Sequence, residues 1–154
     1  MTLECRVVKS EVFLTGSIDE HSSLEKVFAQ LAKTRDDPLV VNLQGVLRIN
    51  SIGVRRWIPL MAALAKSRRV TVSALSYPLV MQANMLVNLM AGAKVVSCMA
   101  PYFCGMCQAN RMVLVAAHEV RRNEPAPSRG CPECGQPMEF DELDNYFAFF
   151  SRQS

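Results

Sequence analysis

The fold of this chain is decided by one stretch, Pro38-Leu-Val-Val-Asn-Leu-Gln-Gly-Val-Leu-Arg-Ile-Asn-Ser-Ile-Gly-Val-Arg-Arg-Trp-Ile58. Leu39 to Leu43 form a nearly continuous apolar run rich in valine, as expected for a strand buried on both faces of a parallel sheet. From Ile52 onward the apolar residues recur with helical spacing. The stripe that this helix should bury comprises Val54, Trp57, Ile58, Met61, Leu64 and Ala65. The stretch therefore predicts a strand, a loop and a helix.

The loop between this strand and helix reads Asn50-Ser51-Ile52-Gly53. Asn50 and Ser51 stand where the helix begins, and either side chain can accept a hydrogen bond from a free N–H group of the first turn. A serine in this place is also a possible phosphorylation site, because a phosphate would meet the same unpaired N–H groups. The residues alone leave both roles of Ser51 open.

Strand and helix signals alternate on both sides of this unit. Strands are expected at Glu4–Lys9, Val12–Thr15, Arg69–Leu75 and Ala93–Cys98. Such alternation predicts an α/β fold with a mostly parallel sheet and right-handed crossovers.

Three helices are expected, and each carries a local signal. Ser22-Ser23-Leu24-Glu25 has the form of a capping box, with Ser22 as N-cap and Glu25 reaching back to it. Pro59 should kink the helix that follows Ser51 or end its first segment. Tyr77-Pro78 opens a third helix, Leu79–Met90, which is apolar nearly all round. Its three methionines indicate either a well-buried helix or an adaptable partner surface.

Residues Leu39–Leu64 resemble the STAS domain, the fold of anti-sigma factor antagonists. In that family an Asp-Ser-(Ser/Thr)-Gly loop follows a buried, valine-rich strand, and a partner kinase phosphorylates the serine. Ser51 and Gly53 match this loop, whereas Asn50 stands at the acidic position. The resemblance extends loosely from Glu11 to about Ser97 and includes Gly16-Ser17-Ile18-Asp19.

The resemblance implies a STAS-like domain over residues 1–100, with a mixed, mostly parallel sheet and helices packed on it. It also implies that the loop docks a regulatory protein, such as an anti-sigma-factor kinase, and that phosphorylation of Ser51 switches the interaction. The expected docking residues are Asn50, Ser51, Ile52, Gly53, Arg55 and Arg56. Without phosphorylation, the same surface would be a constitutive docking site.

The composition changes after Ala100, where two Cys-x-x-Cys pairs appear. Cys104 and Cys107 form the first pair, and Cys131 and Cys134 form the second, within a Cys-Pro-x-Cys-Gly sequence. Four thiolates with this spacing predict a closed, structural Zn²⁺ site, and residues 101–154 resemble a zinc ribbon. Disulfides or a metal-free redox pair are the alternatives, and both suit a cytoplasmic chain with two such pairs less well.

Other features of the second segment carry weaker predictions. Ribbon strands are expected at Arg111–Val120 and Met138–Phe140. The aromatic tail Asp141–Phe150 should pack on the ribbon or dock it to the sheet, because a small ribbon has little core of its own. Cys5 and Cys98 should be inert core residues. His118 is not expected to bind the zinc ion, because the thiolate set is complete without it.

Composition limits the classes of function. The chain has 154 residues, half of them hydrophobic, and a formal charge of +3, which is too weak to imply nucleic acid. No signal peptide is evident, and polar residues interrupt the longest apolar stretch, Leu79–Val96, so a cytoplasmic protein without a membrane span is expected.

Two other classes of function compete with a signalling protein. A transcription-associated ribbon that binds nucleic acid is the alternative, but the arginines and glutamates of Cys104–Phe140 balance. Its cations are Arg111, Arg121, Arg122 and Arg129, and its anions are Glu119, Glu124, Glu133 and Glu139. An enzyme is not expected, because no paired carboxylates, nucleophile–base pair or phosphate loop is evident and four cysteines leave zinc no open position.

Overall fold

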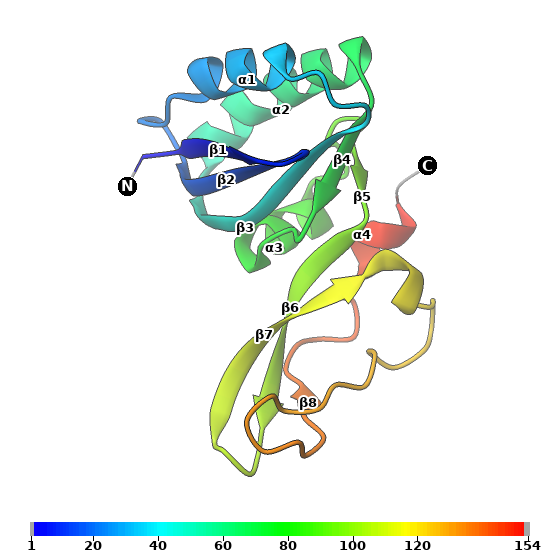
Figure 1. Cartoon of the computed structure of the whole chain (residues 1–154). Helices are drawn as coiled ribbons and strands as arrows, with labels where there is room; N and C mark the ends of the chain where they lie inside the picture. Colours follow the sequence, from blue (N-terminus) through cyan, green and yellow to red (C-terminus); the bar gives the residue numbers. More distant parts are fainter. Residues whose placement is uncertain (1, 153–154) are drawn as a thin grey trace.

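A computed structural model describes residues 2–152 as two sheets, joined where strand β5 of the first is followed directly by strand β6 of the second (Figure 1). The larger sheet has five strands in the order β1-β2-β3-β4-β5. They are β1 (Glu4–Val8), β2 (Glu11–Ile18), β3 (Leu39–Ile49), β4 (Val70–Ser73) and β5 (Lys94–Val95). Only β1 and β2 pair in antiparallel fashion, so the predicted α/β fold with a mixed, mostly parallel sheet is confirmed.

Helices cover both faces of this sheet. Helices α1 (Leu24–Lys33) and α2 (Ser51–Ser67) lie together on one face, and α3 (Tyr77–Met85) lies on the other (Figure 1). Leu39, Val41 and Leu43 of β3 are fully buried, whereas Val40 between them is only half-buried. The strand is thus completely enclosed on one face only, because the nine-residue α3 covers part of the other face.

The second sheet has three strands in the order β7-β6-β8. They are β6 (Ser97–Cys104), β7 (Ala109–Ala116) and β8 (Glu139–Phe140). The strand expected over Ala93–Cys98 as the last of the first domain is present but shorter, because β5 covers only Lys94–Val95 and the chain enters β6 after Val96. Strand β6 then crosses residue 100, where the domain boundary was predicted, and carries the chain into the second sheet (Figure 1).

The predicted capping box at the start of α1 is wrong. Ser23 occupies the N-cap without a side-chain hydrogen bond, and Glu25 pairs with Arg56 instead. The hydroxyl of Ser22 is buried, donates to the carbonyl oxygen of Ser17 at 2.5 Å and accepts from the N–H of Asp19 at 2.9 Å. Ser22 therefore closes the loop between β2 and α1, and its hydroxyl is not available to cap the helix.

Helix α2 does not end at Pro59, which lies inside a helix that continues to Ser67. Because proline has no N–H, the carbonyl group of Arg55 lacks its helical donor. Pro59 is exposed, so water can hydrogen-bond to that carbonyl group instead. Helix α3 ends at Met85 rather than Met90, and the chain then turns until β5. Met81 and Met85 are exposed, so this helix is not buried all round.

The aromatic tail docks the second sheet to the first domain, as expected from the sequence. The side chain of Asn84 in α3 donates to the carbonyl oxygen of Tyr146 at 2.8 Å and accepts from the N–H of Phe149 at 2.9 Å. The buried Tyr146 hydroxyl donates to the carbonyl oxygen of Met99 in β6 at 2.7 Å. One apolar core therefore continues from the five-stranded sheet into the tail and its short helix α4 (Ala148–Ser151).

Candidate metal centre and Ser51 loop

The four cysteines of the Cys-x-x-Cys pairs converge at the far end of the second sheet. Cys104 is the last residue of β6, and Cys107 lies in the turn that leads to β7. Cys131 and Cys134 belong to a second turn, in which the N–H of Gly135 donates to the carbonyl oxygen of Cys131 at 2.9 Å. Gly135 has a φ of +77°, a conformation in which a residue without Cβ is unstrained.

The four sulfur atoms have the spacing of a metal site. All lie within 4.8 Å of one another, with 3.5 Å between the Sγ atoms of Cys104 and Cys134 and 3.9 Å between those of Cys107 and Cys131. Tetrahedral Zn²⁺ with bonds of about 2.3 Å requires sulfur atoms about 3.8 Å apart, whereas a disulfide requires about 2 Å. These cysteines are free thiols that together can hold a metal ion.

The surroundings of the cluster favour a bound cation. Backbone N–H groups of Cys134 and Glu133 donate to the sulfur of Cys131 and lower its pKa to about 6. Hydrogen bonds with Cys134 and Cys104 raise the pKa of Cys107 to about 12, because the crowded thiols share protons. A metal ion replaces those protons and stabilises all four thiolates.

The remaining cysteines and histidines lie outside this centre. Cys98 is fully buried, and burial raises its pKa to about 12, as expected of an inert core thiol. Cys5 is half-buried in the edge strand β1. His118 lies in a short 3₁₀ helix (Ala117–Glu119) and His21 in an exposed loop, and neither belongs to the metal-binding group found among residues 2–152.

The second candidate site is the loop between β3 and α2, where Asn50 is the N-cap. Its Oδ1 accepts from the N–H of Gly53 at 2.8 Å, and its Nδ2 donates to Glu20 at 2.7 Å. Ser51 is the first helical residue and is exposed, and within residues 2–152 its hydroxyl has no hydrogen-bond partner. The sequence had left capping open between these two residues, and the structure assigns it to Asn50.

We expect the different roles of Asn50 and Ser51 to appear in the stability of their alanine variants. Asn50→Ala should lower the free energy of unfolding by about 1 kcal/mol, since it removes the cap, whereas Ser51→Ala should change it by less than about 0.5 kcal/mol. Urea unfolding of both variants measures the contrast. An equal loss in the two variants would contradict the assignment of the cap.

The two arginines after Ser51 have different environments. Arg56 donates to the carbonyl oxygens of Asp19 and Ser22, each at 2.7 Å, and to the carboxylate of Glu25 at 2.9 Å. It therefore holds the β2–α1 loop against α2. Arg55 is exposed and makes no such contacts among the described residues. Because both arginines lie off the apolar stripe, periodicity could not separate the structural residue from the free one.

Two exposed apolar side chains flank the loop, and only one of them belongs to the predicted docking set. Leu47 near the end of β3 is 59% exposed, and Ile52 in the first turn of α2 is 47% exposed. Leu47 was missed because a leucine in a predicted strand is normally assigned to the core. The surface around Ser51 is therefore partly apolar.

Neither a scan of protein-family models nor a search of curated proteins found a match to this chain. Between residues 2 and 152, every helix is too short or too polar to span a membrane.

Proposed function

We propose that this chain is a non-enzymatic, STAS-like interaction protein that docks a regulatory protein through the Ser51 loop, with a C-terminal zinc ribbon as a structural element. The observation that supports the proposal best is the exposure of Ser51. Asn50 caps α2 in its place, so the Ser51 hydroxyl remains available at the N-terminus of a helix. A kinase or a binding partner can reach it without disturbing the fold.

The residues around Ser51 suit a protein partner. Ile52 and Leu47 offer exposed apolar area, and Arg55 adds an exposed cation one turn along α2. Apolar contacts with a polar rim are typical of protein–protein interfaces. Gly53 and Arg56 support this surface from within, because Gly53 is buried and Arg56 binds the neighbouring loop.

Phosphorylation of Ser51 would change this surface strongly. A phosphate adds about 1.5 to 2 negative charges beside the Asn50 side chain, which is bonded to the carboxylate of Glu20. The helix N-terminus and Arg55 favour the added charge within the protein itself. A partner that packs on Ile52 would nevertheless have to remove water from the phosphate, which weakens docking.

We propose Zn²⁺ as the ion of the four-cysteine centre. Four thiolates complete a tetrahedral shell, so they leave no position for a substrate or an activated water molecule. The centre is then structural, and elemental analysis of protein purified without chelator should give about one zinc per chain.

The arginines of the ribbon do not favour nucleic acid as the partner. Arg129 pairs with Glu119 at 2.7 Å, and Arg111 lies beside the sulfur of Cys131, where it offsets the charge of the thiolates. Two of the four ribbon cations are thus already paired within the protein.

Charge at position 51 tests the proposed switch. A partner captured from the native cytoplasm should bind Ser51→Ala as it binds the wild type, and should bind Ser51→Asp at least about tenfold more weakly. The fold should survive the aspartate, since a negative charge at a helix N-terminus stabilises by a few tenths to about 1 kcal/mol. Calorimetric titration at one ionic strength measures the three affinities.

Arg55 provides the control for this experiment. It is exposed and near enough to neutralise an aspartate introduced in place of Ser51, so Arg55→Ala in the Ser51→Asp background should weaken binding further. Arg56→Ala is unsuitable because Arg56 holds the β2–α1 loop. Equal affinities for the wild type, Ser51→Ala and Ser51→Asp would rule out the switch. Unchanged binding to a variant in which both Ile52 and Arg55 are replaced by alanine would rule out the docking surface.

A further inference from the structure

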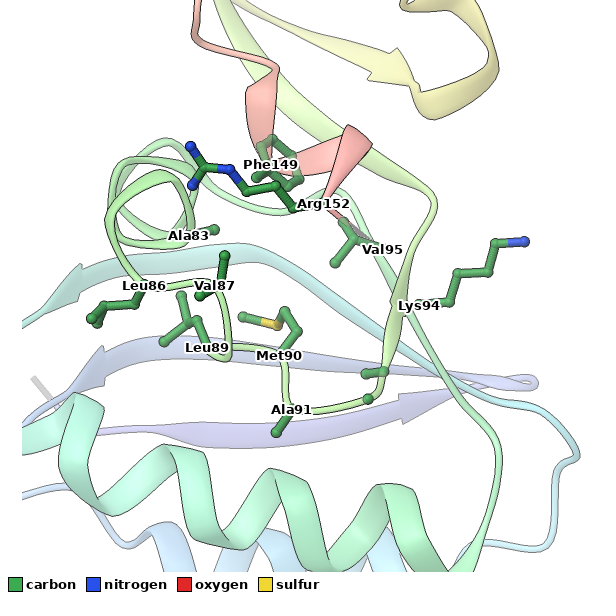
Figure 2. A pocket seen from close by; sticks show the side chains of 12 residues that line it. Ala83, Leu86, Val87, Leu89, Met90, Ala91, Lys94, Val95, Phe149 and Arg152 are labelled. Atoms are coloured by element: carbon green, nitrogen blue, oxygen red, sulfur yellow. The ribbon is translucent and has the colours of Figure 1, made fainter. Parts of the chain in front are cut away.

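An open cavity of about 530 Å³ lies between the end of α3, the turns that follow it and the C-terminal tail. Its walls are largely apolar, and they include Leu86, Val87, Leu89 and Met90 from the α3–β5 segment and Phe149 from α4 (Figure 2). Ligand pockets of about 300 to 1,000 Å³ with apolar walls and a few polar groups commonly form where two structural units meet. This cavity meets each of those criteria.

The charged residues of the cavity are all cations. Lys94 and Arg152 line it, and no acidic side chain between residues 2 and 152 does so. Figure 2 shows Arg152 on one side of the apolar walls, whereas the side chain of Lys94 extends away from them on the other side. Arg152 is held in place because one of its nitrogens donates to the carbonyl oxygen of Asn84 at 2.7 Å.

Positive charge continues beyond Lys94. A neighbouring cleft of about 540 Å³ shares Gly92 and Lys94 with the cavity and is also lined by Lys66, Arg68 and Arg69. Arg69 pairs with Asp37, and Arg68 donates to the backbone carbonyl oxygens of Leu31 in α1 and Thr34 in the loop after it. Lys66 and Lys94 therefore carry the unpaired charge at this end of the cavity.

We propose that the cavity binds a free fatty acid, with the alkyl chain along the α3–β5 segment and the carboxylate at Arg152, while Lys94 adds positive charge near the rim. Apolar walls account for the chain, and the uniform sign of the charges at the rim selects an anion over a neutral or cationic amphiphile. The site is separate from the Ser51 loop and does not depend on the proposed docking function.

The single tryptophan of the chain can report on this cavity. Trp57 is fully buried, and its indole N–H donates at 3.1 Å to the carbonyl oxygen of Leu89, a residue that lines the cavity. A ligand that shifts the Leu89 backbone changes the indole hydrogen bond and hence the fluorescence of Trp57. Binding can thus be followed in the intact protein without an added label.

The intact, metal-loaded chain is titrated with laurate, dodecanol and dodecylammonium, each below its critical micelle concentration. Binding is followed by the emission of Trp57 and by the heat of binding in a calorimeter. One laurate should bind per chain, with an affinity about two- to fivefold higher than that of dodecanol, since one partly exposed ion pair contributes up to about that factor. Dodecylammonium should bind most weakly. Equal affinity for the three amphiphiles, or no saturable binding of laurate, would overturn the proposal.

Variants at one exposed position separate charge from folding. Val87 lines the cavity but is 76% exposed, so Val87→Glu and Val87→Lys should both fold. Both substitutions lose the apolar contact of Val87, so they differ in charge alone, and Val87→Glu should bind laurate at least about fivefold more weakly than Val87→Lys because the two side chains repel and attract the carboxylate, respectively. Arg152→Gln should weaken binding about two- to fivefold, and Lys26→Gln on the distant helix α1 should leave it unchanged.

The test also distinguishes other occupants of the cavity. Sedimentation of the wild type and Val87→Glu would show whether a second copy of the chain fills the groove, and a dimer that Val87→Glu dissociates would overturn the proposal. Equal laurate affinity for Val87→Glu and Val87→Lys would also overturn it, because the ligand would then lie elsewhere.

Discussion

Removing the proposed zinc ion from the four-cysteine centre should unfold the ribbon while the five-stranded sheet remains folded. The segment between β7 and β8 has few anchors apart from the cysteines, among them a hydrogen bond from the Tyr102 hydroxyl to the carbonyl oxygen of Pro127. Strand β8 pairs with β6 through only two residues. Four thiolates that come close together without a metal repel one another, so the free energy of metal binding, about 10 to 16 kcal/mol in small zinc domains, is also the folding energy of this part.

Two groups of aromatic residues make this outcome measurable. Trp57 contacts Phe28 edge to face at 5.2 Å and belongs to the first domain, so its emission should remain after a strong chelator is added at neutral pH. Tyr102 contacts Phe140 at a centroid distance of 5.5 Å in the second sheet, so the contribution of Tyr102 to near-ultraviolet circular dichroism should be lost. Loss of both signals would show that the whole molecule depends on the metal.

Cysteine variants provide the control for chelation. Replacement of Cys104, Cys107, Cys131 or Cys134 by serine should each lower the bound metal from about one to about zero per chain, because three thiolates hold the ion far more weakly than four. Cys5→Ser lies in β1, outside the centre, and should retain the metal. Metal retained in all four cluster variants would place the ion elsewhere.

The parts of the fold that the sequence predicted are those specified by regular patterns. Apolar runs and helical spacing located β3, α2 and the order of elements, and the Cys-x-x-Cys spacing located the four cysteines that the structure brings together. These patterns are local, so tertiary contacts seldom change them.

The errors fall where a polar side chain or the end of an element is fixed by tertiary contacts. Ser22 and Glu25 matched a capping box, but Arg56, 31 residues after Glu25, takes the Glu25 carboxylate, and the backbone of Ser17 takes the Ser22 hydroxyl. Helix α3 was predicted five residues too long because the apolar pattern continues through Leu89 and Met90. Both residues are buried, but they lie in turns rather than in a helix. The cavity could not be predicted, because it is formed by this turn and a tail that is distant in the sequence.

Gly53→Ala should be among the most destabilising single substitutions in the first domain. A Cβ atom at Gly53 would lie 2.0 Å from the carbonyl oxygen of Ile18 and 2.8 Å from the backbone nitrogen of Asp19. Both contacts are with backbone, so no side-chain rotation can relieve them. The N-terminus of α2 would have to move away from β2, breaking the hydrogen bond from the Asn50 N–H to the carbonyl oxygen of Ile18.

Helix propensity alone predicts that Gly53→Ala stabilises the protein, whereas the close backbone contacts predict that it destabilises the protein. The sign of the change in stability therefore tests the geometry. Alanine is favoured over glycine in helices by up to about 1 kcal/mol. Overpacking costs about 1 to 3 kcal/mol and occasionally more, and a Cβ atom 2.0 Å from a backbone oxygen belongs at the upper end of that range. The free energy of unfolding, followed by Trp57 emission in urea, should therefore fall by at least about 2 kcal/mol. Gly105→Ala is the matched control, because a Cβ there meets no atom within 4 Å and should change stability by less than about 0.5 kcal/mol.

The same substitution also relates the fold to the proposed docking surface. Gly53 brings the β3–α2 loop close to the end of β2, and this close approach positions Asn50 beside Glu20. A displaced helix terminus would shift Ser51 and Ile52 together, so a partner of this surface should lose affinity even at temperatures where Gly53→Ala is folded. A Gly53→Ala variant as stable as the wild type would show that the helix terminus and β2 are further apart than the structure places them, and the proposed surface would then have a different shape.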